Sequence, residues 1–413
     1  MIRPLVNRFA RVGGIALCII LLLLCLPYAF CPIYDFPQPH PFHGAFLYNP
    51  YGGDTGRWYK CNFASHSNVW GGIANGKNSN DEIFHAYRSM GYDIVSFGDY
   101  EKISPPRPGQ DINISNYEHG YNIWKRHHIV LGARDVDWFD LVFLQTIHQK
   151  QYILRRLKQS CEILALSHPT LRSAFTENDM RLLTNYDCIE VKSQFSSAEH
   201  LWDAALSAGK PLWILNDDDS HDVTSSEETG RFWTMVYSAS GSPSDIYDAM
   251  RKGRMHGVSG ERGVMDNTLK RVVVDGNEMR IDLVQPASTI QFIGQDGEIE
   301  KEVNDSTRSA VCTFRNTDTY IRTRIRNAHT TFLLNPIFRY NGASLQHFSA
   351  SINWFWSVIY WCTFGLCYSF VVFLFAKHIC PRRLPLKPFL HVTRVLRRIL
   401  RRQTGDLNSP DQR

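Results

Sequence analysis

Short apolar runs recur along the middle of the chain, and each one gives way to polar residues and then to a helical pattern. The first complete unit is Lys60 to Tyr100. Cys61 and Phe63 alternate with polar residues, which indicates a strand. A glycine-rich loop follows, then a helix that Asn80 would cap, and then a second apolar run from Tyr92 to Phe97. Strand, helix and parallel strand form a βαβ unit, whose ligands gather at the strand ends.

The same pattern repeats about six or seven times as far as Gly253, which favours a β/α barrel over an open sheet. From about Lys270 the pattern changes to short alternating runs joined by turn residues. The segment VVVDGNEMRIDLV has an Asp-Gly turn between two such runs, which is a hairpin signal. Similar runs continue to Tyr340, so we predict a small all-β, sandwich-like domain after the barrel.

Two long uncharged runs lie near the two ends of the chain. Gly13 to Phe30 follows several arginines and ends without the small residues of a cleavage site, so we interpret it as an uncleaved anchor rather than a secretory signal. Trp354 to Ala376 is long enough to cross a bilayer and starts with aromatic residues typical of the interface. It is apolar on every face, which argues against a buried core helix. We therefore predict two transmembrane helices.

The distribution of charge orients these two helices. The chain has 413 residues and a net charge of +5, and much of the excess belongs to the basic stretch Lys377 to Arg402. Excess lysine and arginine marks the cytoplasmic side, so we expect a two-pass protein of a bacterial-type cytoplasmic (inner) membrane with both termini inside. The main domain would then lie in the periplasm. Arg394 to Arg402 is basic and amphipathic, which favours membrane lipid over nucleic acid as its partner.

These patterns predict an α/β fold class with a small β domain and two flanking transmembrane helices. The predicted segments are a cytoplasmic N-terminus and anchor (1–31), a linker (32–58), a barrel (59–265), a small β domain (266–348), a transmembrane helix (354–376) and a basic cytoplasmic tail (377–413).

Imidazoles and carboxylates stand at the ends of several predicted strands. A single histidine in such a place is more often structural, and an Asp-x-His pair is commonly a hydrogen-bonding device of a loop. Because strand ends meet at one mouth of a barrel, the combination has the composition of a zinc, manganese or iron site. The candidate metal ligands in these places are His66, Glu118, His119, His127 or its neighbour His128, His168, Asp219 and His221.

The order of these residues resembles that of a known family. Asn-x-x-x-His ending at His66 is followed by Gly-Tyr-Asp, Glu-His-Gly, His, His-Pro and Asp-Ser-His, as in the PHP (polymerase and histidinol phosphatase) domain. The resemblance covers roughly Lys60 to Val258. It implies a distorted seven-stranded barrel, a PHP-type (β/α)7 fold, with a site for two or three metal ions and with hydrolysis of phosphoesters as the usual activity.

Residue by residue, the resemblance implies two groups of metal ligands. They are His66, Glu118 and Asp219 for one ion and Glu118, His127 and His168 for a second. Only His221 remains for a third ion, so we expect His221 to act as a general acid or base, with Asp219 as the other catalytic residue. Ala64 and Tyr100 stand where the family has histidines. We therefore expect one or two divalent ions, zinc, manganese or iron.

One function is preferred and two alternatives remain. The preferred function is that of an enzyme, a metal-dependent phosphoesterase acting outside the cytoplasmic membrane on a phosphorylated small molecule or a lipid-linked phosphoester of the envelope. Tethering at both ends is the reason for favouring an envelope substrate. The first alternative is a non-catalytic binding or scaffold protein on a degenerate PHP barrel, which the two missing histidines would fit. The second is hydrolysis of a bond other than a phosphoester by the same metals.

Overall fold

The computed structural model describes residues 2–53, 55–107, 110–264, 269–343, 345 and 348–379. Contacts divide the chain into two units, one formed by Leu23–Ser357 and the other by the segments before and after it. The basic tail beyond Ile379, including the amphipathic stretch Arg394 to Arg402, lies outside the described residues.

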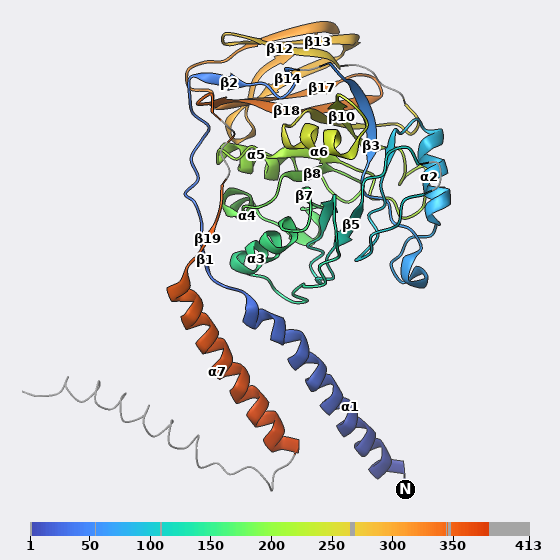
Figure 1. Cartoon of the computed structure of the whole chain (residues 1–413), viewed down its shortest axis with the longest axis vertical. Coiled ribbons are helices and arrows are strands. Elements are labelled where there is room, and N and C mark those ends of the chain that lie inside the picture. The colour runs from blue at the N-terminus through green and yellow to red at the C-terminus, as the bar shows by residue number, and fades with distance from the viewer. Residues whose placement is uncertain are drawn as a thin grey trace, which may run out of the picture. The chain divides into compact units, whose positions relative to one another are not determined.

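Two helices are long and apolar enough to cross a membrane. α1 (Ile2–Cys25) and the 3-10 helix η1 (Leu26–Phe30) include the apolar window Val12–Phe30, and α7 (Trp354–Ile379) is the second (Figure 1). Within the smaller unit, the hydroxyl of Tyr368 on α7 donates a hydrogen bond of 2.9 Å to the carbonyl of Leu22 on α1. The two predicted apolar helices are therefore present and in contact.

The larger unit is built on two main sheets. The strands of the larger sheet, in spatial order, are β15 (Ile299–Val303), β14 (Thr289–Ile293), β17 (Tyr320–Arg326), β18 (Thr330–Tyr340), β11 (Met255–Gly260), β10 (Phe232–Ser238), β3 (Arg57–Asn62) and β4 (Ile94–Val95), with β2 (Phe46–Tyr48) also paired to β18. Those of the smaller sheet are β5 (Asn116–His119), β6 (His128–Leu131), β7 (Ile163–Leu166), β8 (Cys188–Lys192) and β9 (Trp213–Asn216).

Helices and two minor sheets complete this unit. The minor sheets are β12 (Leu269–Asp275) with β13 (Glu278–Ala287) and β16 (Thr307–Thr313), and β1 (Tyr34–Asp35) with β19 (Ser351–Ile352). The helices are η2 (Val69–Gly72), α2 (Asn80–Ser89), α3 (Ile147–Lys158), η3 (Leu171–Ser173), α4 (Glu177–Leu182), α5 (Glu199–Ser207), α6 (Pro243–Arg251) and η4 (Gln295–Gly297). Figure 1 shows β12 to β18 at one end of the unit and α3, α4, β5 and β7 towards the other.

The first βαβ unit forms as the sequence indicates. β3 and β4 are parallel neighbours, with Cys61 opposite Ile94, and α2 connects them. Its cap differs by one residue from the expectation at Asn80. The hydroxyl of Ser79 accepts a hydrogen bond from the Glu82 amide while the Glu82 carboxylate accepts one from the Ser79 amide, so Ser79 is the N-cap of a reciprocal capping box.

The two main sheets are in contact without forming one continuous ring of paired strands. Tyr100, beyond the edge strand β4, makes an isolated parallel bridge with Glu118 of β5. The other edge strand of the smaller sheet, β9, contacts β10, which lies inside the larger sheet: the Asn216 amide donates to the hydroxyl of Thr234, which donates back to the Asn216 carbonyl. Within the described residues the fold is thus a mixed α/β arrangement. β5, β6 and β7 run antiparallel, a feature that hydrophobic periodicity does not encode.

The strands predicted after Lys270 are present, and they divide between two sheets. β12, β13 and β16 form the separate three-stranded sheet, whereas β14, β15, β17 and β18 extend the sheet of β3. β18 pairs with β11 over His256 to Gly260, and β17 and β14 continue the same sheet. The predicted boundary at residue 266 is therefore crossed by a continuous sheet. Turn residues predict hairpins, but they do not specify which earlier strand the hairpins pair with.

A buried ion pair fastens these strands to the helical part of the unit. Arg322 on β17 is 1% exposed, and its Nε and Nη2 lie 2.7 and 2.6 Å from the two carboxylate oxygens of Asp203 on α5. Its guanidinium also lies 5.2 Å from the Trp202 ring centroid. Because a buried charge is costly without its partner, removing Arg322 would leave the Asp203 carboxylate uncompensated.

We predict that Arg322→Met destabilises the protein by about 3–5 kcal/mol, the cost of breaking a buried ion pair from one side. The matched control is Arg271→Met, because Arg271 pairs with Asp282 but is 55% exposed. Exposed pairs contribute about 0–1 kcal/mol. Urea unfolding of the full chain in detergent measures both. Equal losses of stability in the two variants would contradict the importance of the buried pair.

Candidate metal centre

The six residues predicted as metal ligands come together in the larger unit. They arrive from the ends of strands in both main sheets. His66 follows β3, His168 follows β7, and Asp219 and His221 follow β9. Glu118 lies in β5 and His127 directly precedes β6. All of them except His221 are at most 2% exposed. This burial is unusual for so many ionisable groups, which are seldom fully buried unless they are paired or bind metal.

Glu118 lies at the middle of the group. Its Oε2 is 3.1 Å from Nδ1 of His127 and 3.6 Å from Nε2 of His66. Its Oε1 is 3.3 Å from Nε2 of His168 and accepts a hydrogen bond of 2.9 Å from the Ser167 hydroxyl. One carboxylate therefore contacts histidines from three separate strand ends.

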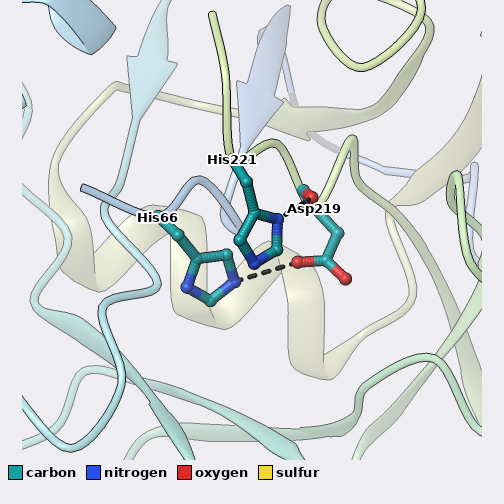
Figure 2. Close-up of side chains that lie close together, drawn as sticks. All are labelled: His66, Asp219 and His221. Carbon is teal, nitrogen blue, oxygen red and sulfur yellow. Dashed lines mark hydrogen bonds and ion pairs between the residues drawn. The ribbon is translucent and has the colours of Figure 1, made fainter. Parts of the chain in front are cut away.

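Asp219 and His221 lie beside His66 (Figure 2). Oδ1 of Asp219 lies 2.9 Å from Nε2 of His66, as the dashed line in Figure 2 marks. The rings of His66 and His221 stack with centroids 4.5 Å apart, and Nδ1 of His221 is 3.0 Å from the Asp219 carbonyl oxygen. Ligand atoms of His66, Asp219 and His221 lie within 4.8 Å of one another, and so do those of Glu118, His127 and His168.

The neighbouring aspartates fix the loop that carries Asp219. Asp217 accepts a hydrogen bond of 2.7 Å from the Phe63 amide at the end of β3. Asp218 accepts hydrogen bonds from the Tyr87 hydroxyl and from the amides of residues 230, 231 and 232. The amide of His66 donates to the Ser220 carbonyl at 2.8 Å. Of the three acidic residues, Asp219 alone thus belongs to the cluster, while the other two hold backbone.

Alternation along the strands separates His127 from His128. Glu118 and His127 point into the cluster, whereas His119 and His128 are opposite each other in the β5–β6 pairing, with ring centroids 5.6 Å apart. Successive side chains of a strand point to opposite faces, so His128 lies on the far side. The structure therefore places His127, and not His128, beside Glu118.

The charges of the cluster are mutually dependent. Burial opposes ionisation of Glu118, but His127, His168 and His66 outweigh it and hold the pKa of Glu118 well below its usual range. Burial likewise opposes the charged form of His168, while Glu118 raises the pKa of that imidazole to about 9. Asp219 and Glu118 raise the pKa of His66 against the effect of burial. Burial lowers the pKa of His127. A divalent cation would replace the protons of His66 and His168, because metal binding displaces protons from its ligands.

The donor set fits a divalent metal ion. Donor atoms held about 2.1 Å from one metal stand about 3.0–3.4 Å apart, and the separations of 2.9–3.6 Å around Glu118 and Asp219 are close to this. Glu118 Oε2 is buried and accepts no hydrogen bond among the described residues. Three imidazoles with two carboxylates suit zinc, manganese or iron.

Tyr100 occupies the space beside His66 where the family resemblance implied a further histidine. Its ring stacks on His66 with centroids 4.6 Å apart and meets His127 edge-on at 5.3 Å. Burial and the charges of Glu118 and Asp219 raise the pKa of the Tyr100 phenol well above its usual value. The side chain therefore stays neutral and fills the site instead of adding a charged ligand.

Glu190 belongs to the surroundings of the cluster although sequence reasoning did not single it out. It lies in β8 with no exposed surface, and its Oε2 accepts hydrogen bonds from the His168 amide at 2.5 Å and the Ser193 hydroxyl at 3.1 Å. Burial and the charge of Asp219 raise the pKa of Glu190 to about 8. The available signal was a glutamate inside the apolar run CIEVK.

Comparisons with known proteins found one similar solved structure. It is the crystal structure, from Bacteroides vulgatus ATCC 8482, of a two-domain protein described as containing a predicted PHP-like metal-dependent phosphoesterase. The two chains share 14% sequence identity, and the alignment covers 74% of this chain and 92% of that one at a TM-score of 0.38. No family model and no curated protein matches the chain. We therefore infer function from the geometry of the site.

We predict that His127→Gln removes bound metal and that His128→Gln retains it. Both substitutions exchange a buried imidazole for a neutral amide on adjacent residues, but His127 alone lies beside Glu118. Elemental analysis of the purified full chain after incubation with Mn²⁺ or Zn²⁺ measures the bound metal per chain. Equal metal content in the two variants would count against His127 as a ligand.

Proposed function

We propose that this protein is a metal-dependent phosphoesterase built on a distorted PHP-type barrel. The observation that carries the proposal is the position of Glu118, whose Oε2 lies near His66 and His127 and whose Oε1 lies near His168. A carboxylate between two groups of ligands is the arrangement needed to bridge two metal ions. Pairs of metal ions about 3.5–4 Å apart recur in phosphatases and nucleases.

The residues divide into roles around such a pair. Asp219 and His66 would hold one ion, His127 and His168 the other, and Glu118 both. Divalent ions at such a site supply Lewis acidity and lower the pKa of water. Ser167 and Glu190 orient the ligands by their hydrogen bonds to Glu118 and to the His168 amide. Such outer partners fix the geometry of the ligands and thereby contribute to metal affinity and activity.

His221 is suited to proton transfer in this scheme. It is only half-buried, whereas the other members of the cluster are buried. If its Nδ1 donates to the Asp219 carbonyl at 3.0 Å, its Nε2 remains the basic nitrogen. An imidazole in this state accepts a proton from an attacking water or, once protonated, gives one to a leaving alcohol.

We expect Asp219→Asn to abolish hydrolysis of p-nitrophenyl phosphate in the presence of Mn²⁺ or Zn²⁺. Loss of an outer partner of a metal site already costs about 10–100-fold, and loss of a ligand costs more. The control is Asp222→Asn, because Asp222 lies three residues away and pairs with the exposed Lys77. Chelation with EDTA should remove the activity of the wild type, and added metal should restore it.

A binding protein without activity is the competing proposal, and the substitutions at Ala64 and Tyr100 are what favours it. Full-length protein that binds no metal and hydrolyses no phosphoester with added Mn²⁺ or Zn²⁺ would support this alternative. Metal bound without hydrolysis of any phosphoester tested would instead support the hydrolysis of another kind of bond.

We further propose that the larger unit lies outside the cytoplasmic membrane. The support is the pair of apolar helices at the two ends of the chain together with the basic residues that follow the second. A reporter that fluoresces only in the cytoplasm should be active when fused after residue 413. Alkaline phosphatase, which folds only in the periplasm, should be active when inserted at Asp296, in the tight turn before β15. The opposite pattern would reverse the proposed topology and place the substrate in the cytoplasm.

A further inference from the structure

A cavity of about 490 Å³ adjoins the candidate metal centre. Tyr100 and His127 form part of its wall, so the cavity directly borders the cluster. The remainder of the wall comes from the loop around η2, from the turn between β5 and β6, and from Glu101 and Arg172. A group attached to a phosphate at the metal centre would extend into this space.

One side of the cavity is apolar although it faces solvent. Ile73 is 89% exposed, Trp70 49%, Ile123 48% and Tyr121 46%. Scattered exposed apolar side chains are common on proteins. Four around a single cavity form an apolar surface, and a ligand that removes this surface from water is stabilised by doing so. Such a wall offers few hydrogen bonds to the hydroxyl groups of a sugar.

The other feature of the cavity is positive charge close to the metal centre. Nζ of Lys125 lies 5.8 Å from the centroid of the Tyr100 ring, and no hydrogen bond or ion pair of this ammonium occurs among the described residues. Arg172 lines the same cavity. A cation next to metal ligands complements a phosphoryl group, whereas the apolar wall complements a group without charge.

The wall is held in place by hydrogen bonds. Nε1 of Trp70 donates to the Tyr100 carbonyl at 2.8 Å, and Nη1 of Arg172 donates to the Ile123 carbonyl at 2.8 Å. Asn122 also ties the turn to the loop before α3 through the Phe143 carbonyl at 2.7 Å. A pre-formed wall binds its ligand without the cost of ordering the loops first.

We propose that this cavity binds the apolar group of an amphiphilic phosphoester, so that the substrate is the phosphate ester of an apolar alcohol. The proposal rests on the phosphoesterase function proposed above and narrows its substrate class. The apolar group is either an alkyl chain, as in a lipid, or an aromatic ring, since both would cover the wall formed by Ile73, Trp70 and Ile123.

The test measures binding of phosphonates, whose carbon–phosphorus bond a phosphoesterase does not cleave. Methylphosphonate, n-octylphosphonate and 1-naphthylmethylphosphonate are titrated into the full chain in lipid nanodiscs, with and without Mn²⁺, and empty nanodiscs correct for partitioning. We expect at least one of the two larger ligands to bind about ten-fold or more tightly than methylphosphonate, which corresponds to about 1.4 kcal/mol. Preference for octyl over naphthylmethyl would indicate an alkyl source, and the reverse an aromatic one.

Substitutions in the cavity wall test whether the preference for the larger phosphonates arises there. Ile123→Asp or Ile73→Asp should reduce the ratio of affinities towards one, because a carboxylate on the wall repels both the apolar group and the phosphonate. The matched control is Ile299→Asp on β15, where an isoleucine of similar exposure (51%) lies outside the cavity. It should retain the wild-type ratio, and thermal unfolding should show that all three variants fold.

Two results overturn the inference. One is equal affinity for the three phosphonates, including no detectable binding of any of them. The other is loss of the preference in Ile299→Asp as much as in Ile123→Asp. Failure of the proposed function looks different, because the preference would persist in a protein that hydrolyses no phosphoester with added metal. Hydrolysis of p-nitrophenyl phosphate with no preference among phosphonates would reject the inference alone.

Discussion

The burial of Glu118 among three imidazoles is the constraint on which the rest of the site depends. A carboxylate that is 1% exposed loses nearly all its hydration, and only positive charge at close range compensates for that loss. His66 and His168, whose pKa values are raised, provide it as imidazolium groups, or a divalent cation would provide it in their place. The cluster is therefore stable only with protons or metal bound, and exchange between the two couples its structure to its chemistry.

Much of the surrounding fold holds this cluster in position. The carboxylate of Asp218 accepts hydrogen bonds from three backbone amides and the Tyr87 hydroxyl, and the carboxylate of Glu190 accepts one from the amide of His168. His168 and Asp219 both have left-handed backbones, with φ of 27° and 52°. For residues other than glycine, such backbone conformations cost about 1–3 kcal/mol and persist only where the surrounding structure enforces them. Strain of this kind is typical of sites that position ligands.

The cavity beside the cluster combines positive charge with apolar surface. Lys125 places an ammonium near the ligands, while Ile73 and Ile123 present exposed hydrocarbon a short distance away. The two apolar helices, which are long enough to cross a membrane, are compatible with the proposed substrate, which combines a charged head with an apolar group. The separate features of the chain are thus consistent with one kind of substrate, and each of them is open to an independent measurement.

The sequence by itself determined the apolar helices, the first βαβ unit and the identity of the clustered residues. These depend on local patterns: uncharged length, alternation of period two, and polar residues directly after apolar runs. Tertiary structure alone decided that His127 rather than His128 faces Glu118, that Asp217 and Asp218 hold backbone, and that Glu190 supports His168. It also decided that β14, β15, β17 and β18 extend the sheet of β3. Each of these depends on strand direction, register and pairing partner. These three properties are set by packing between segments far apart in the chain, and local periodicity carries no information about that packing.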